Sequence, residues 1–442
     1  MCSNRSGTTS TSTWSCPSGR LPENPRADGV GELRLGPPSA SVISVGQVLD
    51  SLTIRNLRGY GTLEVAFGRG PHIVWGPNAA GKTSLVEAVV LLAVGRSHRT
   101  TTDTELVRWG ADLARVEGAL GDGTAIEVAI VRPGVAGPAQ GTPGRKRIRV
   151  NGVGRRASGL LGLLRVVVFA PEEMLLVTGP PALRRSAIDA IASQRSPAYV
   201  RDLTSYGRAL AQRNSLLRAI REEQASRDEL PFWTETLLEA GGAIVAARLA
   251  LLEELADPIR AAHAEIAPEE ARDARLSLTY ATNAPTLPGE IPRDALARRL
   301  VETAEKEIWN GTTLIGPHRD DVVFEQAGRD LATFASRGQQ RTAILAFKLA
   351  ELDLLTALDG RPPLLLLDDV FSELDLERRA HLVRRIAALP QAVVTTTTLA
   401  DLDPELRAHA TSWQVEPALP SELDRGARLI GPKQPVAPEA RS

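Results

Sequence analysis

The stretch Gly76-Pro77-Asn78-Ala79-Ala80-Gly81-Lys82-Thr83 follows the pattern G-x-x-x-x-G-K-[S/T]. Residues 71–75 before it are typical of a strand, and residues 84–94 after it contain no glycine or proline and favour a helix. In such a loop the backbone N–H groups and the positive end of the helix hold phosphates. Lys82 is expected to reach the β- and γ-phosphates, and Thr83 to ligate Mg²⁺. A plain glycine-rich turn is the alternative. The predicted nucleotide-binding residues are Gly76, Pro77, Asn78, Ala79, Ala80, Gly81, Lys82, Thr83 and Ser84.

Far downstream, four leucines at residues 364–367 run into Asp368 and Asp369. This pattern predicts a strand that is buried on both faces, with carboxylates at its C-terminal edge. Asp368 is expected to hold Mg²⁺ directly or through water, and Asp369 to polarise the attacking water. A buried strand that ends in an acidic turn is common, so the motif gains weight mainly from the loop upstream.

Between these two motifs lies Ala335-Ser336-Arg337-Gly338-Gln339-Gln340-Arg341, followed by leucines with helical spacing. A Ser-x-Gly-Gln turn at the start of a helix is a second candidate anion site. The serine hydroxyl, the backbone N–H groups and the positive end of the helix dipole would all be directed at the same anion. An ordinary helix cap formed by Ser336 is the alternative.

The order of these motifs, followed by Ser372-Glu373-Leu374-Asp375, resembles the Walker A, signature, Walker B and D-loop series of ABC and SMC ATPases. The resemblance implies an α/β fold: a P-loop ATPase head with a mixed sheet and flanking helices, interrupted by a smaller helical lobe. It implies ATP and Mg²⁺ as ligands. It also implies an ATP-dependent homodimer, in which Ser336, Gly338, Gln339 and Asp375 of one copy join Lys82 and Asp369 of the other in catalysis.

Within that superfamily the flanking motifs resemble the RecF family. They are Leu52-Thr53-Ile54-Arg55-Asn56-Leu57-Arg58-Gly59-Tyr60, Arg147-Ile148-Arg149-Val150-Asn151-Gly152, Phe169-Ala170-Pro171-Glu172-Glu173, Gly316-Pro317-His318-Arg319-Asp320-Asp321 and the Ser336 motif. The likeness implies an ATP-gated DNA-binding protein of recombinational repair and replication-fork maintenance. Such a protein binds gaps or junctions, helps to load recombinase with RecR- and RecO-type mediators, and is reset by slow, DNA-stimulated ATP hydrolysis.

The sequence departs from the family pattern at three places. Ala79 stands where the loop usually has glycine, and a positive φ at that position would strain it. Thr395-Thr396-Thr397-Thr398 follows Val394, with no histidine of the transporter type. No Q-loop glutamine is evident near Phe169, which leaves the link between helical lobe and active site unassigned.

Composition and hydrophobic pattern divide the chain into predicted domains. Residues 1–47 are rich in Ser, Thr, Pro and Gly, contain both cysteines (Cys2 and Cys16), and are expected to be a disordered extension. The ATPase lobe is expected at 48–178 and 311–415, the helical lobe at 179–310 and a flexible tail at 416–442. No apolar run is long enough to span a membrane, so a cytoplasmic, nucleoid-associated protein is expected.

A net charge of −1 means that any DNA contact comes from a local patch. Residues 128–171 contain no Asp or Glu, and this stretch is predicted to contact DNA phosphates. A hairpin whose charges only keep it soluble is the alternative. A soluble transporter ATPase and another SMC-like chromosome protein are the competing functions. The predicted DNA-binding residues are Arg145, Lys146, Arg147, Arg149, Arg155 and Arg156.

Overall fold

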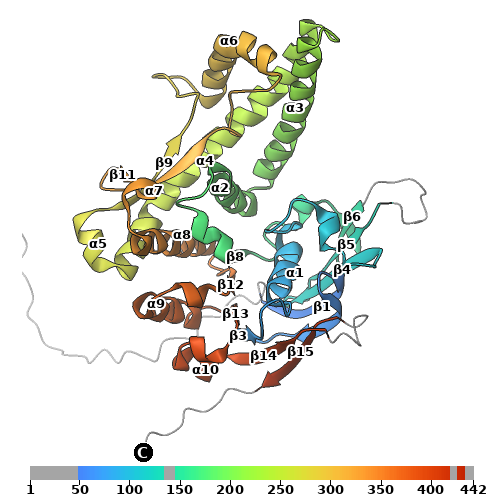
Figure 1. Ribbon diagram of the computed structural model, residues 1–442, viewed down its shortest axis with the longest axis vertical. Helices are drawn as coiled ribbons and strands as arrows, with labels where there is room; N and C mark the ends of the chain where they lie inside the picture. Colours follow the sequence, from blue (N-terminus) through green and yellow to red (C-terminus); the bar gives the residue numbers. More distant parts are fainter. Residues whose placement is uncertain (1–47, 134–144, 419–425, 434–442) are drawn as a thin grey trace, which may run out of the picture. The chain divides into compact units, whose positions relative to one another are not determined.

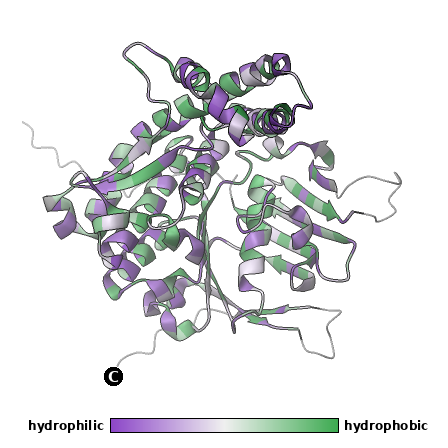
Figure 2. Cartoon of the chain, turned by 45° about the horizontal axis from the view of Figure 1, so that its top comes forward, coloured by the Kyte–Doolittle hydropathy of each residue, from purple (hydrophilic) through white to green (hydrophobic). Residues whose placement is uncertain are grey.

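The computed structural model describes residues 48–133, 145–418 and 426–433. The extension predicted for residues 1–47 lies outside them. Two six-stranded sheets and a three-stranded sheet are formed, together with the helices labelled in Figure 1. Hydrophobic and hydrophilic residues alternate along strands and helices (Figure 2), and β4 alternates between buried and partly exposed positions throughout. The sheet that contains β4 (Leu113–Leu120) therefore presents one face to a core, whereas β12 (Leu364–Asp368) and β13 (Gln391–Thr396) of the other six-stranded sheet are buried along their whole length.

The first sheet is antiparallel and runs in the order β2-β1-β4-β5-β6-β7. Consecutive strands are joined mainly by tight connections, which explains the antiparallel pairing. Its strands are β1 (Leu49–Leu57), β2 (Tyr60–Ala66), β4 (Leu113–Leu120), β5 (Ala125–Val131), β6 (Arg145–Val150) and β7 (Val153–Arg155).

The second sheet runs in the order β15-β14-β3-β13-β12-β8, and all its pairs are parallel except β14 with β15. Its parallel strands are brought together from distant parts of the chain, as crossover connections require. The strands are β3 (Gly70–Trp75), β8 (Val166–Phe169), β12 (Leu364–Asp368), β13 (Gln391–Thr396), β14 (Thr411–Glu416) and β15 (Arg428–Lys433).

Helix α1 (Lys82–Val94) packs against strands of both six-stranded sheets. Its leucines, valines and alanines are buried on every side, which is the pattern of a helix enclosed in a core. The loop before α1 is thereby fixed at the C-terminal end of β3. The first part of the ATPase head is built around this helix.

Helices of the predicted helical lobe follow β8. Helix α3 (Pro197–Arg221) packs against α4 (Leu230–Ile266), which buries an apolar stripe that includes Leu238 and Ile259. The remaining helices either extend this lobe or cover the parallel sheet. The helices other than α1 are α2 (Pro181–Arg195), α3 (Pro197–Arg221), α4 (Leu230–Ile266), α5 (Pro268–Asp273), α6 (Pro292–Asn310), α7 (Leu331–Phe334), α8 (Arg337–Ala357), α9 (Leu376–Ala387) and α10 (Pro404–His409).

Two features differ from the sequence expectations. Strand β10 (Asp321–Gln326) does form, but it pairs with β9 (Leu276–Ala281) and β11 (Arg329–Asp330) rather than with the ATPase sheet. Strand β9 lies inside the stretch expected to be helical. The prediction of a flexible tail was wrong for residues 428–433, because β15 pairs there with β14. The domain boundaries themselves stay a prediction.

Candidate nucleotide-binding site

The loop at residues 76–83 leaves β3 and turns directly into α1, and two of its glycines are required by close contacts. A Cβ on Gly76 would lie 2.4 Å from the carbonyl oxygen of Val415. Gly81 has φ +117°, and its carbonyl accepts a hydrogen bond of 3.1 Å from the hydroxyl of buried Tyr60. The loop backbone therefore lies in close contact with β14 on one side and with the first sheet on the other. Within the loop, the N–H of Gly76 donates to the carbonyl of Thr396 and the N–H of Ala80 to that of Pro77.

Lys82 folds back over this loop. Its ammonium donates hydrogen bonds of 2.8 Å to the carbonyl of Gly76 and 3.0 Å to that of Pro77, and the residue is 6% exposed. Burial lowers the pKa of Lys82, while the carboxylates of Asp369 and Asp368 act in the opposite direction. No side chain in the described part of the chain caps the first turn of α1. A cation and open N–H groups together fit a phosphate.

Ala79 has φ +62°, so the strain anticipated from the sequence is present. A Cβ in the left-handed region costs roughly 1–2 kcal/mol. Backbone strain of this kind is often stored at ligand-binding loops. The loop thus keeps its family shape without the usual glycine.

The C-terminal edge of β12 brings the two predicted acids beside this loop. Asp368 is 3% exposed and accepts a 2.6 Å hydrogen bond from the hydroxyl of Thr395 on the neighbouring strand. Asp369 has φ +54°, and burial raises its pKa, while Lys82 opposes the shift. The Thr-rich segment therefore orients the acidic pair. Residues 48–133, 145–418 and 426–433 contain no cluster of His, Cys, Asp or Glu suited to hold a metal alone.

The predicted signature residues start α8. Ser336 forms a capping box: its hydroxyl accepts from the backbone N–H of Gln339 at 3.3 Å, and the Gln339 side chain accepts from the N–H of Ser336 at 2.9 Å. Ser336 is exposed and Gly338 partly so. The cap expected as the alternative is present. It leaves an exposed helix N-terminus, which is also what an anion site needs.

The predicted D-loop is tied to this helix within the same chain. Asp375 caps α9 by accepting from the backbone N–H of Arg378 at 3.0 Å. The guanidinium of Arg378 donates to the hydroxyl of Thr342 on α8 at 2.9 Å. Arg341 of α8 also forms an ion pair of 2.7 Å with Glu373. The predicted D-loop is therefore linked to α8 by side-chain contacts.

Comparison with known proteins agrees with this geometry. Residues 48–403 match the family described as the RecF/RecN/SMC N terminal domain. The protein named DNA replication and repair protein RecF of Geobacillus thermodenitrificans is 40% identical over 384 residues, which cover 83% of this chain and 97% of the relative. This chain belongs to the RecF family. The expected family and fold class are confirmed.

Further relatives and solved structures carry the same name. The RecF of Chloroflexus aurantiacus is 40% identical over 387 residues, covering 83% of this chain and 97% of its own length. A solved recombination mediator protein RecF with ATP, of the RecFOR pathway, has a TM-score of 0.74 and 29% identity; 88% of this chain and 98% of that chain are covered.

One cluster of charged side chains was not predicted from the sequence. It lies after Phe169, in the region where this RecF chain has no evident Q-loop glutamine. Glu173, just after β8, forms an ion pair of 2.6 Å with Lys348 of α8, and Lys348 also contacts Glu351 at 3.0 Å. Burial raises the pKa of Glu173 to about 7, although Lys348 opposes the shift. The polar Lys348 within the apolar face of α8 was the signal that could have revealed it.

Arg58, in the turn between β1 and β2, pairs with helix α1 in this RecF protein. It forms a two-pronged ion pair with Glu87 of α1, at 2.8 and 2.9 Å. The backbone carbonyl of Glu105 accepts a third hydrogen bond of 2.9 Å. These contacts link β1 to the helix behind the loop. Arg58 therefore braces α1.

The motif at residues 316–321 is structural. A Cβ on Gly316 would lie 2.3 Å from the Tyr206 hydroxyl, which is 2.6 Å from the His318 ring. The carboxylate of Asp320 accepts from the Tyr280 hydroxyl at 2.7 Å, and Asp321 binds Arg184 through both oxygens at 2.8 Å. His318 is therefore held by contacts within the fold.

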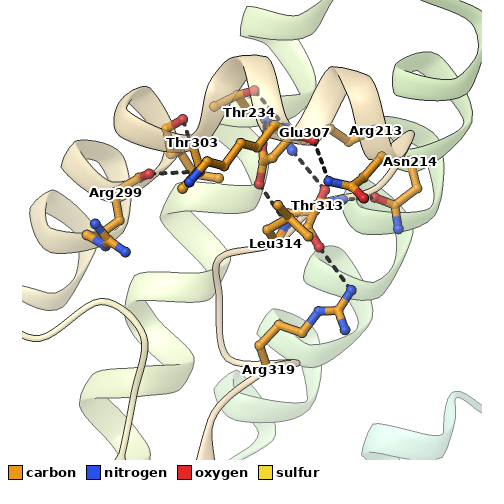
Figure 3. Close-up of polar contacts among 12 residues, drawn as sticks. Arg213, Asn214, Thr234, Arg299, Thr303, Glu307, Thr313, Leu314 and Arg319 are labelled. Atoms are coloured by element: carbon orange, nitrogen blue, oxygen red, sulfur yellow. Dashed lines mark hydrogen bonds and ion pairs between the residues drawn. The ribbon is translucent and has the colours of Figure 1, made fainter. Parts of the chain in front are cut away.

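A second buried network adjoins this motif (Figure 3). Arg213 donates to Glu307 at 2.7 Å and to the Thr313 hydroxyl at 2.8 Å. The other Glu307 oxygen accepts from the N–H of Leu314 at 2.7 Å. Arg319 donates to the carbonyl of Thr313 at 3.4 Å. The family motif thus anchors α3, α6 and the segment that leads to β10.

The predicted DNA-binding residues fall on the β6–β7 hairpin with different surroundings. Lys146 is paired with Asp103 at 2.8 Å, and Arg149 with Glu127 at 3.5 Å. Nothing is described of the Arg145 side chain. The exposed residues without an ion pair in the described ranges are Arg147, Arg155 and Arg156.

Proposed function

We propose that this chain is an ATP-dependent DNA-binding protein of recombinational repair and replication-fork maintenance, in which ATP holds two copies together. The observation that carries the proposal is that one chain contains two helix N-termini suited to bind phosphate. One is the loop with the uncapped α1, and the other is the exposed N-terminus of α8 at Ser336. The names of the relatives and the RecF–ATP structure support it.

The chain's own residues fit MgATP. The N–H groups of the loop and of α1 face the phosphates, and Lys82 exchanges its loop carbonyls for phosphate oxygens. Thr83 and Asp368 are the proposed Mg²⁺ ligands, because hydroxyl and carboxylate oxygens suit this ion. Asp369, whose pKa is raised chiefly by burial, orients and polarises a water molecule. When bound, ATP supplies the γ-phosphate, and its hydrolysis releases the partner copy.

The second copy completes the site in this proposal. Ser336, Gly338 and Gln339 of one copy contact the γ-phosphate held by the loop of the other, and Asp375 lies beside them. The contacts of Arg378 and Arg341 join the D-loop to α8, so the presence of the phosphate is relayed along the signature helix. Glu173 and Lys348 pass this signal on to the segment that enters the helical lobe.

Binding of DNA gaps or junctions, cooperation with RecR- and RecO-type mediators, and slow DNA-stimulated hydrolysis complete the proposal. The exposed arginines of the β6–β7 hairpin provide sequence-independent phosphate contacts. None of the helices in the described part of the chain has the length and apolar composition for a membrane crossing. We place the protein in the cytoplasm with the nucleoid.

Light scattering of the purified protein tests the dimer. With ATP the wild-type chain should double its mass, whereas ADP, or ATP added to Lys82→Ala, should leave a monomer. Wild type that stays monomeric in ATP would refute the proposal. For DNA, Arg155→Glu/Arg156→Glu should weaken duplex binding and flatten its dependence on salt. The matched control is Arg201→Glu/Arg329→Glu, two exposed arginines on α3 and β11.

A further inference from the structure

The outer face of the antiparallel sheet carries arginines in one cross-strand row. Arg55 of β1 lies opposite Arg115 of β4, Arg115 opposite Ala129 of β5, and Ala129 opposite Arg147 of β6. We call Arg55, Arg115 and Arg147 the arginine row. Arg55 and Arg147 are exposed, and the side chain of Arg115 is 37% exposed. Strands β1, β4, β5 and β6 are consecutive neighbours in this sheet (Figure 1), and Ala129 of β5, which is 6% exposed, separates Arg115 from Arg147 in the row.

The three arginines of the row differ in whether a carboxylate lies nearby. Arg115 has Glu127 at 3.5 Å and Glu117 at 3.9 Å, both in the next row along the strands. Neither Arg55 nor Arg147 has a carboxylate within ion-pair distance in the described part of the chain. Like charges directly opposite each other destabilise a sheet. The positions of Arg55 and Arg115 therefore favour an anionic ligand that lies between them.

An exposed tryptophan stands at the end of the sheet beside this row. Trp109 is 94% exposed, although large aromatic side chains usually bury most of their surface. It precedes Gly110, which has φ +81°, in a turn closed by a 3.0 Å hydrogen bond from the N–H of Ala111 to the carbonyl of Arg108. The N–H of Arg108, the residue before Trp109, donates to the carbonyl of Asn56, the residue after Arg55, which places the turn at this end of the row.

The turn is held rigidly in place. The N–H of Arg108 donates to the carbonyl of Asn56 at 2.9 Å, and the guanidinium of Arg132 donates to the carbonyls of Val107 and Arg108 at 3.0 and 3.3 Å. Lys146 of β6 holds the preceding segment through Asp103. A rigid turn presents the indole ring without the entropy loss that ordering a mobile loop would add on binding.

We infer that the arginine row and Trp109 form a subsite for an unpaired nucleic-acid strand, with phosphates on the arginines and a base stacked on the indole. From Arg55 to Arg147 the row spans three strand spacings, roughly 14 Å, which is enough for more than one phosphate. Basic residues next to exposed aromatics are the pattern of single-strand binding. Bases in a duplex are stacked on each other, so only unpaired bases are available to Trp109.

This inference rests on the proposed function, since it names the part of a gapped DNA that this face holds. Fluorescence anisotropy with ATP, using a labelled oligo-dT and a blunt duplex, tests both separately. Trp109→Ala should weaken oligo-dT binding about tenfold and leave duplex binding unchanged. Trp309→Ala removes a 77% exposed tryptophan on α6 and should change neither. Trp109→Phe, which keeps a ring, should recover most of the oligo-dT affinity.

The role of the arginines is tested by measuring how oligo-dT affinity depends on salt concentration. Arg55→Ala/Arg147→Ala should reduce the salt slope of oligo-dT binding by about 1.4, since each single-strand phosphate contact contributes about 0.7. The double variant Arg201→Ala/Arg329→Ala is the matched control. Unfolding curves establish that each variant is folded.

Three results would overturn the subsite. Unchanged oligo-dT affinity in Trp109→Ala, with normal duplex binding, would refute it while leaving the proposed function intact. Polyglutamate binding that falls in Arg55→Ala/Arg147→Ala, with oligo-dT binding unchanged, would assign the face to an acidic protein segment. Wild type that binds neither nucleic acid would refute both proposals.

Discussion

The loop at residues 76–83 and the motif at residues 316–321 both mark the family in the sequence, yet they differ in where their polar groups find partners. In the second motif, His318, Asp320 and Asp321 are engaged by Tyr206, Tyr280 and Arg184 of the same chain. The loop instead has an uncapped helix and a strained Ala79. A family motif is thus a candidate ligand site only where the fold leaves its polar groups available.

Replacing Arg248 should give the largest difference in stability between the two regions. Arg248 is 3% exposed, and its guanidinium donates to the carboxylate of Asp189 at 2.9 and 3.0 Å and to the carbonyl of Pro317 at 2.8 Å. Arg248→Met removes the guanidinium partner of the Asp189 carboxylate, which is 16% exposed and keeps the hydrogen bond from the Tyr199 hydroxyl, and should lower the free energy of unfolding by about 3–5 kcal/mol. Urea denaturation measures this loss. Nucleotide affinity of the folded protein should be unchanged.

Arg272→Met is the control for that variant, because the Arg272 side chain is 73% exposed and, among the described residues, its ion pair is with Glu269 on its own helix. Its effect should stay below about 1 kcal/mol. If Arg248→Met instead weakened nucleotide binding and left stability unchanged, the distinction between the two regions would fail.

The second effect is a dependence of stability on pH. Burial lowers the pKa of His318 from 6.5 to about 4, so the unfolded chain takes up a proton on this ring before the folded chain does. Its contribution to stability is present above pH 6.5 and is lost as pH falls towards 4. The shift corresponds to at most about 3 kcal/mol.

Unfolding of wild type and His318→Gln, measured at several pH values, isolates this contribution. The variant should lose less stability than wild type over the acidic part of the series. Parallel curves for the two proteins would mean that His318 is accessible to solvent, as a ligand-binding histidine would be.

Lys82→Ala should give the opposite pattern to Arg248→Met. Without nucleotide, the stability of the variant should lie within about 1 kcal/mol of wild type. In the described part of the chain, Lys82 donates hydrogen bonds to two loop carbonyls and interacts with the carboxylates of Asp368 and Asp369 through charge. With ATP at a hundredfold excess over Kd, wild type should gain about 2.7 kcal/mol and the variant almost nothing. Thermal melting with and without ATP measures both quantities. An equal gain in the variant would remove Lys82 from the site.

The smallest effect concerns Ala79. Ala79→Gly removes a Cβ from the left-handed region, while the more flexible unfolded chain offsets part of the gain. We expect up to about 1 kcal/mol of added stability, measured by urea denaturation. A loss of stability would show that the loop is not strained at this position.

The sequence was sufficient for features that local residue patterns encode. The β3 strand, the start of α1 and the buried β12 strand with its two acids were all predicted from glycines, leucines and carboxylates. The roles assigned to Ser336 and Asp375 stay predictions. The positive φ of Ala79 followed from its place in the loop pattern.

Features that depend on distant pairing were not predicted. Strand β9 alternates at Leu276, Leu278 and Tyr280, but nothing local shows that it pairs with β10 across α6. Strand β15 is likewise stabilised by β14. The partners Glu173 and Lys348 are far apart in sequence, and only the packing of α8 on β8 and the segment after it brings them together.

A mixing experiment tests the shared nucleotide site most directly. Lys82→Ala lacks a working loop and Ser336→Arg lacks a working signature, so neither should form ATP-dependent dimers alone. When mixed, they should form heterodimers with one intact site, made from the loop of Ser336→Arg and the signature of Lys82→Ala. Light scattering and ATP turnover should then recover to a measurable fraction of wild type. A mixture no more active than the two variants measured separately would contradict the account.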